Sequence, residues 1–134
     1  MLKLIVGEMG TNKTGVLLDK ANELIEVSEN HIVYIDHDNR HLTDLKHEVR
    51  FVNIADFPID NVDEFLGFLC GIISNDYDIK HIFIDGLFKV MKTEIDDLSL
   101  VLPRLEKLSE MYKLDFYITV SAKKIDSKFD KYLA

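Results

Sequence analysis

Five short apolar segments alternate with stretches of helical periodicity, and this alternation constrains the fold more than any other feature of the chain. The first, second and fourth segments are mostly unbroken apolar runs, a pattern typical of strands that are covered on both faces. We therefore predict five strands at Leu2–Val6, His31–Ile35, Arg50–Ile54, His81–Ile84 and Phe116–Val120.

Three longer segments between these strands place apolar residues at helical spacing. They are Thr14–Val27, Asn61–Ser74 with Asp60 or Asn61 as its cap, and Asp96–Lys113, in which Pro103 introduces a kink or marks where the regular helix begins. The polar segment His41–Glu48 is compatible with a short helix or a loop. Strands that alternate with helices predict an α/β fold with a mainly parallel sheet and helices on both faces.

Length and composition limit the class of protein. A chain of 134 residues is expected to form one domain, 1–134, and to bury a substantial core. It contains no apolar run long enough to cross a membrane, and the first residues do not resemble a signal peptide. The single cysteine, Cys70, suits a cytoplasmic location and is expected to be a packed thiol within an apolar helix. The formal net charge of −8 argues against direct, nonspecific binding to nucleic acid.

The segment 7–14, GEMGTNKT, follows the first predicted strand and precedes the first predicted helix. Backbone N–H groups in such a loop point at phosphate oxygens, and the helix N-terminus adds partial positive charge. Lys13 can reach the terminal phosphates, and the hydroxyl of Thr14 can reach Mg²⁺. Asn12 stands where the usual spacing has glycine, and asparagine is the residue that best tolerates positive φ after glycine. The alternative is a plain turn before a helix, with Thr11 or Asn12 as N-cap.

Carboxylates follow two of the predicted strands. Asp85 ends the segment HIFID, and Asp36 and Asp38 follow the strand at His31–Ile35. Ligands of open α/β sheets bind at the carboxyl ends of strands, so Asp85 and Thr14 should lie at one edge, where a carboxylate can hold Mg²⁺. Asp38 or Asp36 can orient an attacking water in hydrolysis. Solvated acidic loops are the alternative for all three residues.

Together these segments resemble the P-loop NTPase superfamily, and within it the RecA-like ATPase branch. GEMGTNKT resembles the Walker A loop, HIFIDG resembles the Walker B strand, and Asp38 stands where the family often has a glutamate that activates water. The last predicted strand resembles the one whose polar end senses the γ-phosphate, with Thr119 and Ser121 as candidates. The resemblance implies the strand order 3-2-4-5-1 and binding of ATP and Mg²⁺. It implies catalytic roles for Lys13 and Asp38 and metal binding by Thr14 and Asp85. The implied nucleotide-binding residues are Gly7, Glu8, Met9, Gly10, Thr11, Asn12, Lys13, Thr14 and Ser121.

The expected function is that of a Mg-ATP-binding protein with slow ATP hydrolase activity. Asn12 and Gly86, which follows Asp85, favour a nonhydrolytic nucleotide-binding module that regulates a partner. A small phosphotransferase, similar to a nucleoside kinase, is a second alternative. We expect a second copy of the chain or a protein partner to supply the cation that stabilises the transition state. The candidates within the chain are Lys123, Lys124, Arg104 and Arg40, and a solvated loop is the alternative for the two lysines.

Overall fold

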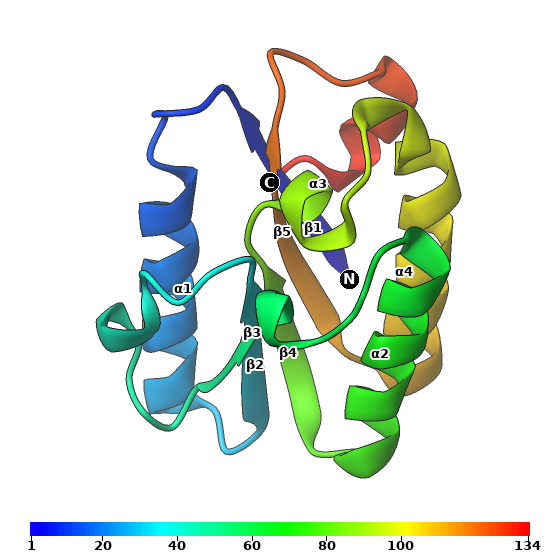
Figure 1. The fold of residues 1–134 in the computed structure, drawn as a ribbon. Coiled ribbons are helices and arrows are strands. Elements are labelled where there is room, and N and C mark those ends of the chain that lie inside the picture. Colours follow the sequence, from blue (N-terminus) through cyan, green and yellow to red (C-terminus); the bar gives the residue numbers. More distant parts are fainter.

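The computed structural model describes residues 1–134 and contains a five-stranded sheet in which every pair of neighbouring strands is parallel (Figure 1). The strands are β1 (Leu2–Gly7), β2 (His31–Asp36), β3 (Arg50–Asn53), β4 (Ile79–Ile84) and β5 (Asp115–Ser121). Their order is β1-β5-β4-β2-β3, which is the expected 3-2-4-5-1 order read from the opposite edge. The predicted α/β fold and strand order are thus confirmed.

Helices cover both faces of the sheet (Figure 1). Helix α1 (Lys13–Val27) lies on one face, while α2 (Val62–Asn75) and α4 (Leu98–Tyr112) lie on the other together with the short α3 (Leu87–Met91). None of these helices has both the length and the apolar composition needed to cross a bilayer. The chain also forms four short 3₁₀ helices, at Leu42–Asp44, Ile54–Asp56, Ile95–Asp97 and Ser127–Tyr132.

The hydrophobic core consists of two clusters, one on each face of the sheet. On the α1 side, Leu17 and Ala21 pack with Ile32 and Tyr34 of β2. The residues that alternate with these in β2, such as Val33, belong to the larger cluster beneath α2, α3 and α4. Side chains of a strand point alternately to the two faces, so a strand buried on both sides reads as an unbroken apolar run.

Several local expectations are resolved by the structure. Asn61 caps α2, because its side-chain oxygen accepts a hydrogen bond from the Glu64 N–H at 2.9 Å. Helix α4 begins at Leu98, so Pro103 lies inside it and does not mark its beginning. The segment 41–48 contains only the 3₁₀ turn at Leu42–Asp44. The expectation that Cys70 is packed is wrong: Cys70 is exposed, because it lies off the apolar stripe of α2.

The carboxyl ends of the strands meet at one edge of the sheet. Gly7 at the end of β1 is paired with Ser121 at the end of β5. Asp36 ends β2 and Asp85 directly follows β4, the neighbouring strand. The Asp85 N–H donates to the Ile35 carbonyl at 2.9 Å, which extends the ladder past the end of β4. The predicted polar residues are therefore brought to a common edge, as expected for a parallel sheet.

Candidate functional site

The loop between β1 and α1 is held by contacts among its own residues. The Thr11 hydroxyl donates to the Glu8 carbonyl at 2.7 Å, and Lys13 Nζ donates to the same carbonyl at 2.8 Å. The backbone is left-handed at Gly10, with φ 84°, and again at Asn12, with φ 62°. Positive φ is unstrained for glycine and tolerated by asparagine, so both residue types suit the turns they make. The bond from Lys13 Nζ to the Glu8 carbonyl holds the ammonium group against the backbone of the loop.

Asn12 is the N-cap residue of α1, but its side chain makes no capping hydrogen bond. Instead it occupies the space beside Gly15, where an added Cβ would lie 2.3 Å from Asn12 Oδ1. Real Cβ atoms do not approach another atom so closely. A side chain at position 15, in the first turn of the helix, would therefore require the exposed Asn12 side chain to move aside.

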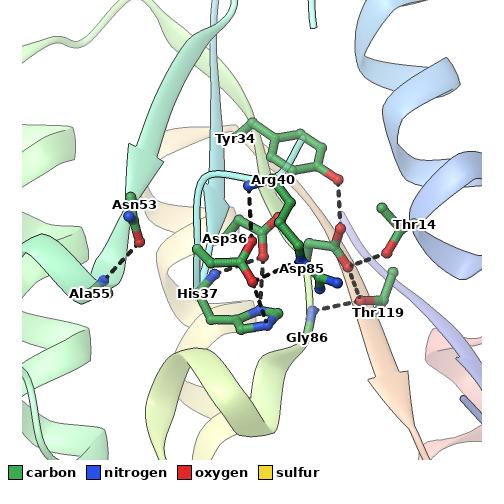
Figure 2. A network of polar contacts seen from close by, with 11 residues as sticks. Thr14, Tyr34, Asp36, His37, Arg40, Asn53, Ala55, Asp85, Gly86 and Thr119 are labelled. Atoms are coloured by element: carbon green, nitrogen blue, oxygen red, sulfur yellow. Dashed lines mark hydrogen bonds and ion pairs between the residues drawn. The ribbon is translucent and has the colours of Figure 1, made fainter. Parts of the chain in front are cut away.

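Asp85 is the centre of a network of hydroxyl groups (Figure 2). Its Oδ1 accepts from Thr14 Oγ1 at 3.2 Å and from Thr119 Oγ1 at 2.9 Å, and its Oδ2 accepts from the Tyr34 hydroxyl at 2.8 Å. Thr119 also accepts from the Gly86 N–H at 2.7 Å. Asp85 is 6% exposed, so three side chains from α1, β2 and β5 satisfy a nearly buried carboxylate.

Sequence reasoning did not identify Tyr34 as part of this network. Tyr34 is fully buried in the α1-side cluster, where its ring stacks against Phe83 and Phe51. Burial is the largest cause that raises the pKa of Tyr34, and the negative charge of Asp85 raises it further. The phenol therefore stays protonated and remains a hydrogen-bond donor. The only available signal was a tyrosine within an apolar strand, since a buried hydroxyl needs a polar partner.

Asp36 and Asp38 lie in different environments. Asp36 is 2% exposed and accepts from the His37 N–H at 2.7 Å, and burial raises the pKa of this carboxyl. Asp38 accepts from the Arg40 N–H at 3.1 Å through Oδ1 and from Arg40 Nε at 3.0 Å through Oδ2. The backbone hydrogen bond from Arg40 is the largest cause that lowers the pKa of Asp38. Asp38 is therefore an ionised group that holds Arg40.

A cavity of about 510 Å³ opens above the carboxyl edge of the sheet. Its lining contains three basic side chains and a single carboxylate, Asp85, in a chain whose net charge is −8. The basic residues come from three elements: Lys13 from the start of α1, Arg40 from the segment after β2, and Lys89 from α3. The full lining consists of Met9, Gly10, Asn12, Lys13, Thr14, His37, Arg40, His41, Asp85, Gly86, Phe88, Lys89, Thr119 and Ser121.

Most residues singled out in the sequence lie at this cavity. Met9, Gly10, Asn12, Lys13, Thr14, Asp85 and Ser121 line it. Gly7 ends β1, and Glu8 and Thr11 belong to the loop that follows it, but none of the three lines the cavity, and neither does Asp38. Thr119 lines the cavity, but its hydroxyl is engaged with Asp85 and Gly86. His37, His41, Phe88 and Lys89 were not predicted, because nothing in their local sequence indicates which loops meet above the sheet.

The chemistry of the cavity suits an anion accompanied by a hard cation. Lys13, Arg40 and Lys89 attract negative charge, and the start of α1 contributes partial positive charge. The Thr14 hydroxyl and the Asp85 carboxylate are oxygen ligands of the kind that Mg²⁺ prefers, and they already lie within hydrogen-bonding distance of each other. No protein-family model matches this chain, and a search of curated proteins finds no relative.

Proposed function

We propose that this chain binds ATP together with Mg²⁺ in the cavity at the carboxyl edge of its sheet. We further propose that it is a slow ATPase of the P-loop NTPase superfamily, in the RecA-like branch. The observation that carries the proposal is the contact between Thr14 Oγ1 and Asp85 Oδ1, at 3.2 Å, directly beside the loop that contains Lys13. It joins a hydroxyl at a helix start to a carboxylate at a strand end, the two groups needed to hold a phosphate-bound cation.

Each residue has a distinct part in the proposed site. The backbone of the loop Gly7–Thr14 would cradle the phosphates. The Lys13 ammonium group, which donates to the Glu8 carbonyl in the structure, would bind the terminal phosphates. Thr14 and Asp85 would hold Mg²⁺, directly or through water, and the hydroxyls of Tyr34 and Thr119 keep Asp85 oriented. When bound, the cation would neutralise charge on the phosphate oxygens.

A nonhydrolytic nucleotide-binding module is the second candidate, and one observation favours it. Asp85 is the only carboxylate that lines the cavity, and it is engaged by three hydroxyl groups. Asp38 accepts from Arg40 through both of its oxygens, its Oδ2 also lies 3.3 Å from His37 Nε2, and it does not line the cavity. A carboxylate that accepts hydrogen bonds from an arginine and has a lowered pKa is a weak base for activating water.

Thermal unfolding with and without Mg-ATP tests the proposal. At about one hundred times the dissociation constant, binding should stabilise the wild-type protein by about 2.7 kcal/mol. Lys13→Ala should lose most of this stabilisation, whereas Lys20→Ala, an exposed lysine of the same helix, should keep it. Equal shifts for Lys13→Ala and wild type would contradict the phosphate-binding role of the loop. Release of inorganic phosphate by the wild type then distinguishes a slow ATPase from a nonhydrolytic module.

A further inference from the structure

Arg40 is a cation of the cavity that is anchored by a carboxylate. Its own carboxylate partner, Asp38, accepts one hydrogen bond from the Arg40 backbone N–H and another from Nε, at 3.1 and 3.0 Å. Both contacts lie within a single short turn after β2, so the backbone and the side chain of Arg40 are fixed together. Lys89, the other cation on this side, makes no ion pair and is held by nothing comparable.

The geometry of the guanidinium leaves it able to bind an anion. Nε–H is used by Asp38, while the two terminal nitrogens make no hydrogen bond in the structure. The side chain is 67% exposed, although Arg40 also lines the cavity that contains Lys13, Thr14 and Asp85. Arginine binds phosphate oxygens through paired N–H groups, and a carboxylate at Nε fixes the plane in which those groups lie.

The position of Arg40 relative to the loop suggests which phosphate it meets. Lys13 and Thr14 begin α1, directly after the loop that follows β1, whereas Arg40 comes from the segment after β2, which is separated from β1 in the sheet by β5 and β4. Figure 2 shows Asp85 between Thr14 and the turn that contains Arg40. A phosphate chain that is cradled by the loop and reaches the Thr14–Asp85 pair would therefore approach Arg40 with its terminal group.

We propose that Arg40, oriented by Asp38, contacts the terminal phosphate and makes the site selective for nucleoside triphosphates over diphosphates. This inference rests on the proposed function, since it assumes that the loop holds the other phosphates. Asp38 is then a positioning residue, in place of the water-activating role predicted from the sequence. The basic side chain that meets the terminal phosphate then comes from the same chain, whereas the sequence led us to expect it from another subunit or a partner.

Calorimetric titration with ADP and with the β,γ-imido analogue of ATP, both in Mg²⁺, tests the inference. Wild type should bind the triphosphate more tightly. Arg40→Gln should weaken triphosphate binding by about tenfold or more, as expected for loss of a charged hydrogen bond, and should change ADP binding by less than about twofold. Asp38→Asn should also reduce the preference for the triphosphate over ADP. Asp38→Asn added to Arg40→Gln should have no further effect, because the two residues act as one unit.

The exposed pair Lys92–Asp60, with Nζ to Oδ1 at 2.9 Å, provides a control outside the lining of the cavity. Lys92→Gln and Asp60→Asn should leave both affinities unchanged. Equal weakening of ADP and triphosphate by Arg40→Gln would overturn the inference, and so would additive effects of Arg40→Gln and Asp38→Asn. Failure of the wild type to bind either nucleotide would instead refute the proposed function itself.

Discussion

The hydroxyl of Thr14, in the first turn of α1, donates a hydrogen bond to Oδ1 of Asp85, in the segment that directly follows β4. Seventy-one positions separate the two residues in the chain. They meet because β1 and β4 both flank β5 in a parallel sheet, which brings the residues after these two strands to the same edge.

Removal of the Thr14 hydroxyl should weaken nucleotide binding only when Mg²⁺ is present. Thr14→Val keeps the size and the β-branch of the side chain but removes the oxygen, so we expect a loss of about tenfold in Mg²⁺ and little change in EDTA. Thr14→Ser retains the oxygen and should bind nearly as wild type does. Titration of a fluorescent ATP analogue measures both conditions. Equal losses with and without Mg²⁺ would mean that Thr14 contacts the nucleotide or supports the loop rather than the cation.

Tyr34→Phe should destabilise the protein while leaving the aromatic packing in place. The ring still stacks on Phe83 and Phe51, but Asp85 Oδ2 loses its hydrogen-bond donor in a buried site. Loss of a hydrogen bond to a buried charged group should cost about 1.5–3 kcal/mol in the free energy of unfolding. Urea denaturation at neutral pH measures this change. Tyr77→Phe, at a tyrosine that is 66% exposed, serves as the control and should cost much less.

Gly15→Ala should stabilise the protein less than an unopposed glycine-to-alanine change in a helix. The added Cβ would lie 2.3 Å from Asn12 Oδ1, at the end of an exposed side chain that makes no capping hydrogen bond, so the Asn12 amide must move aside. Gly71→Ala in α2 is the matched control, because nothing lies within 4 Å of its added Cβ, and it should stabilise by about 0.5–1 kcal/mol. In the background of Asn12→Gly, Gly15→Ala should stabilise as much as Gly71→Ala does, as measured by urea denaturation. Equal effects of Gly15→Ala with and without the Asn12 side chain would show that this side chain does not oppose the methyl group.

Asp36→Asn should stabilise the protein at neutral pH, and the gain should disappear in acid. Burial raises the pKa of Asp36 in the folded state, so the folded protein binds a proton there more readily than the unfolded chain. The carboxylate therefore costs stability above its folded pKa, and the cost vanishes below the ordinary aspartate pKa of about 3.9. Denaturation curves of both proteins from neutral to acidic pH check the sign. A difference in the free energy of unfolding between Asp36→Asn and wild type that grows as the pH falls would contradict this account.

If the guanidinium group of Arg40 supplies the positive charge within one molecule, ATP turnover per chain should not depend on protein concentration. Specific activity should stay constant over about a hundredfold dilution, since an interaction inside the chain is not governed by mass action. Light scattering over the same range reports the oligomeric state. If specific activity and molecular mass both fall on dilution, the positive charge at the terminal phosphate must come from a second copy of the chain.

The pattern of apolar and polar residues was sufficient to predict the five strands, the three long helices and the loop at Gly7–Thr14. A helix or strand that is buried on one or both faces has a characteristic spacing of apolar residues, which can be recognised in the sequence. The edge of the sheet at which Thr14 and Asp85 meet also followed, because parallel strands all end on the same side. The strand order was implied by the family resemblance and is confirmed by the structure.

Three-dimensional packing was needed for the contacts within the site. The bond from Tyr34 to Asp85 and the close approach of the Asn12 amide to Gly15 both rest on side-chain positions that no local pattern encodes. The position of Arg40 likewise depends on how its turn closes around Asp38. Hydrophobic periodicity reports how much of each segment is buried, but it does not report which polar atoms of different segments meet. Those partners are set by the arrangement of strands and the need to satisfy a buried carboxylate.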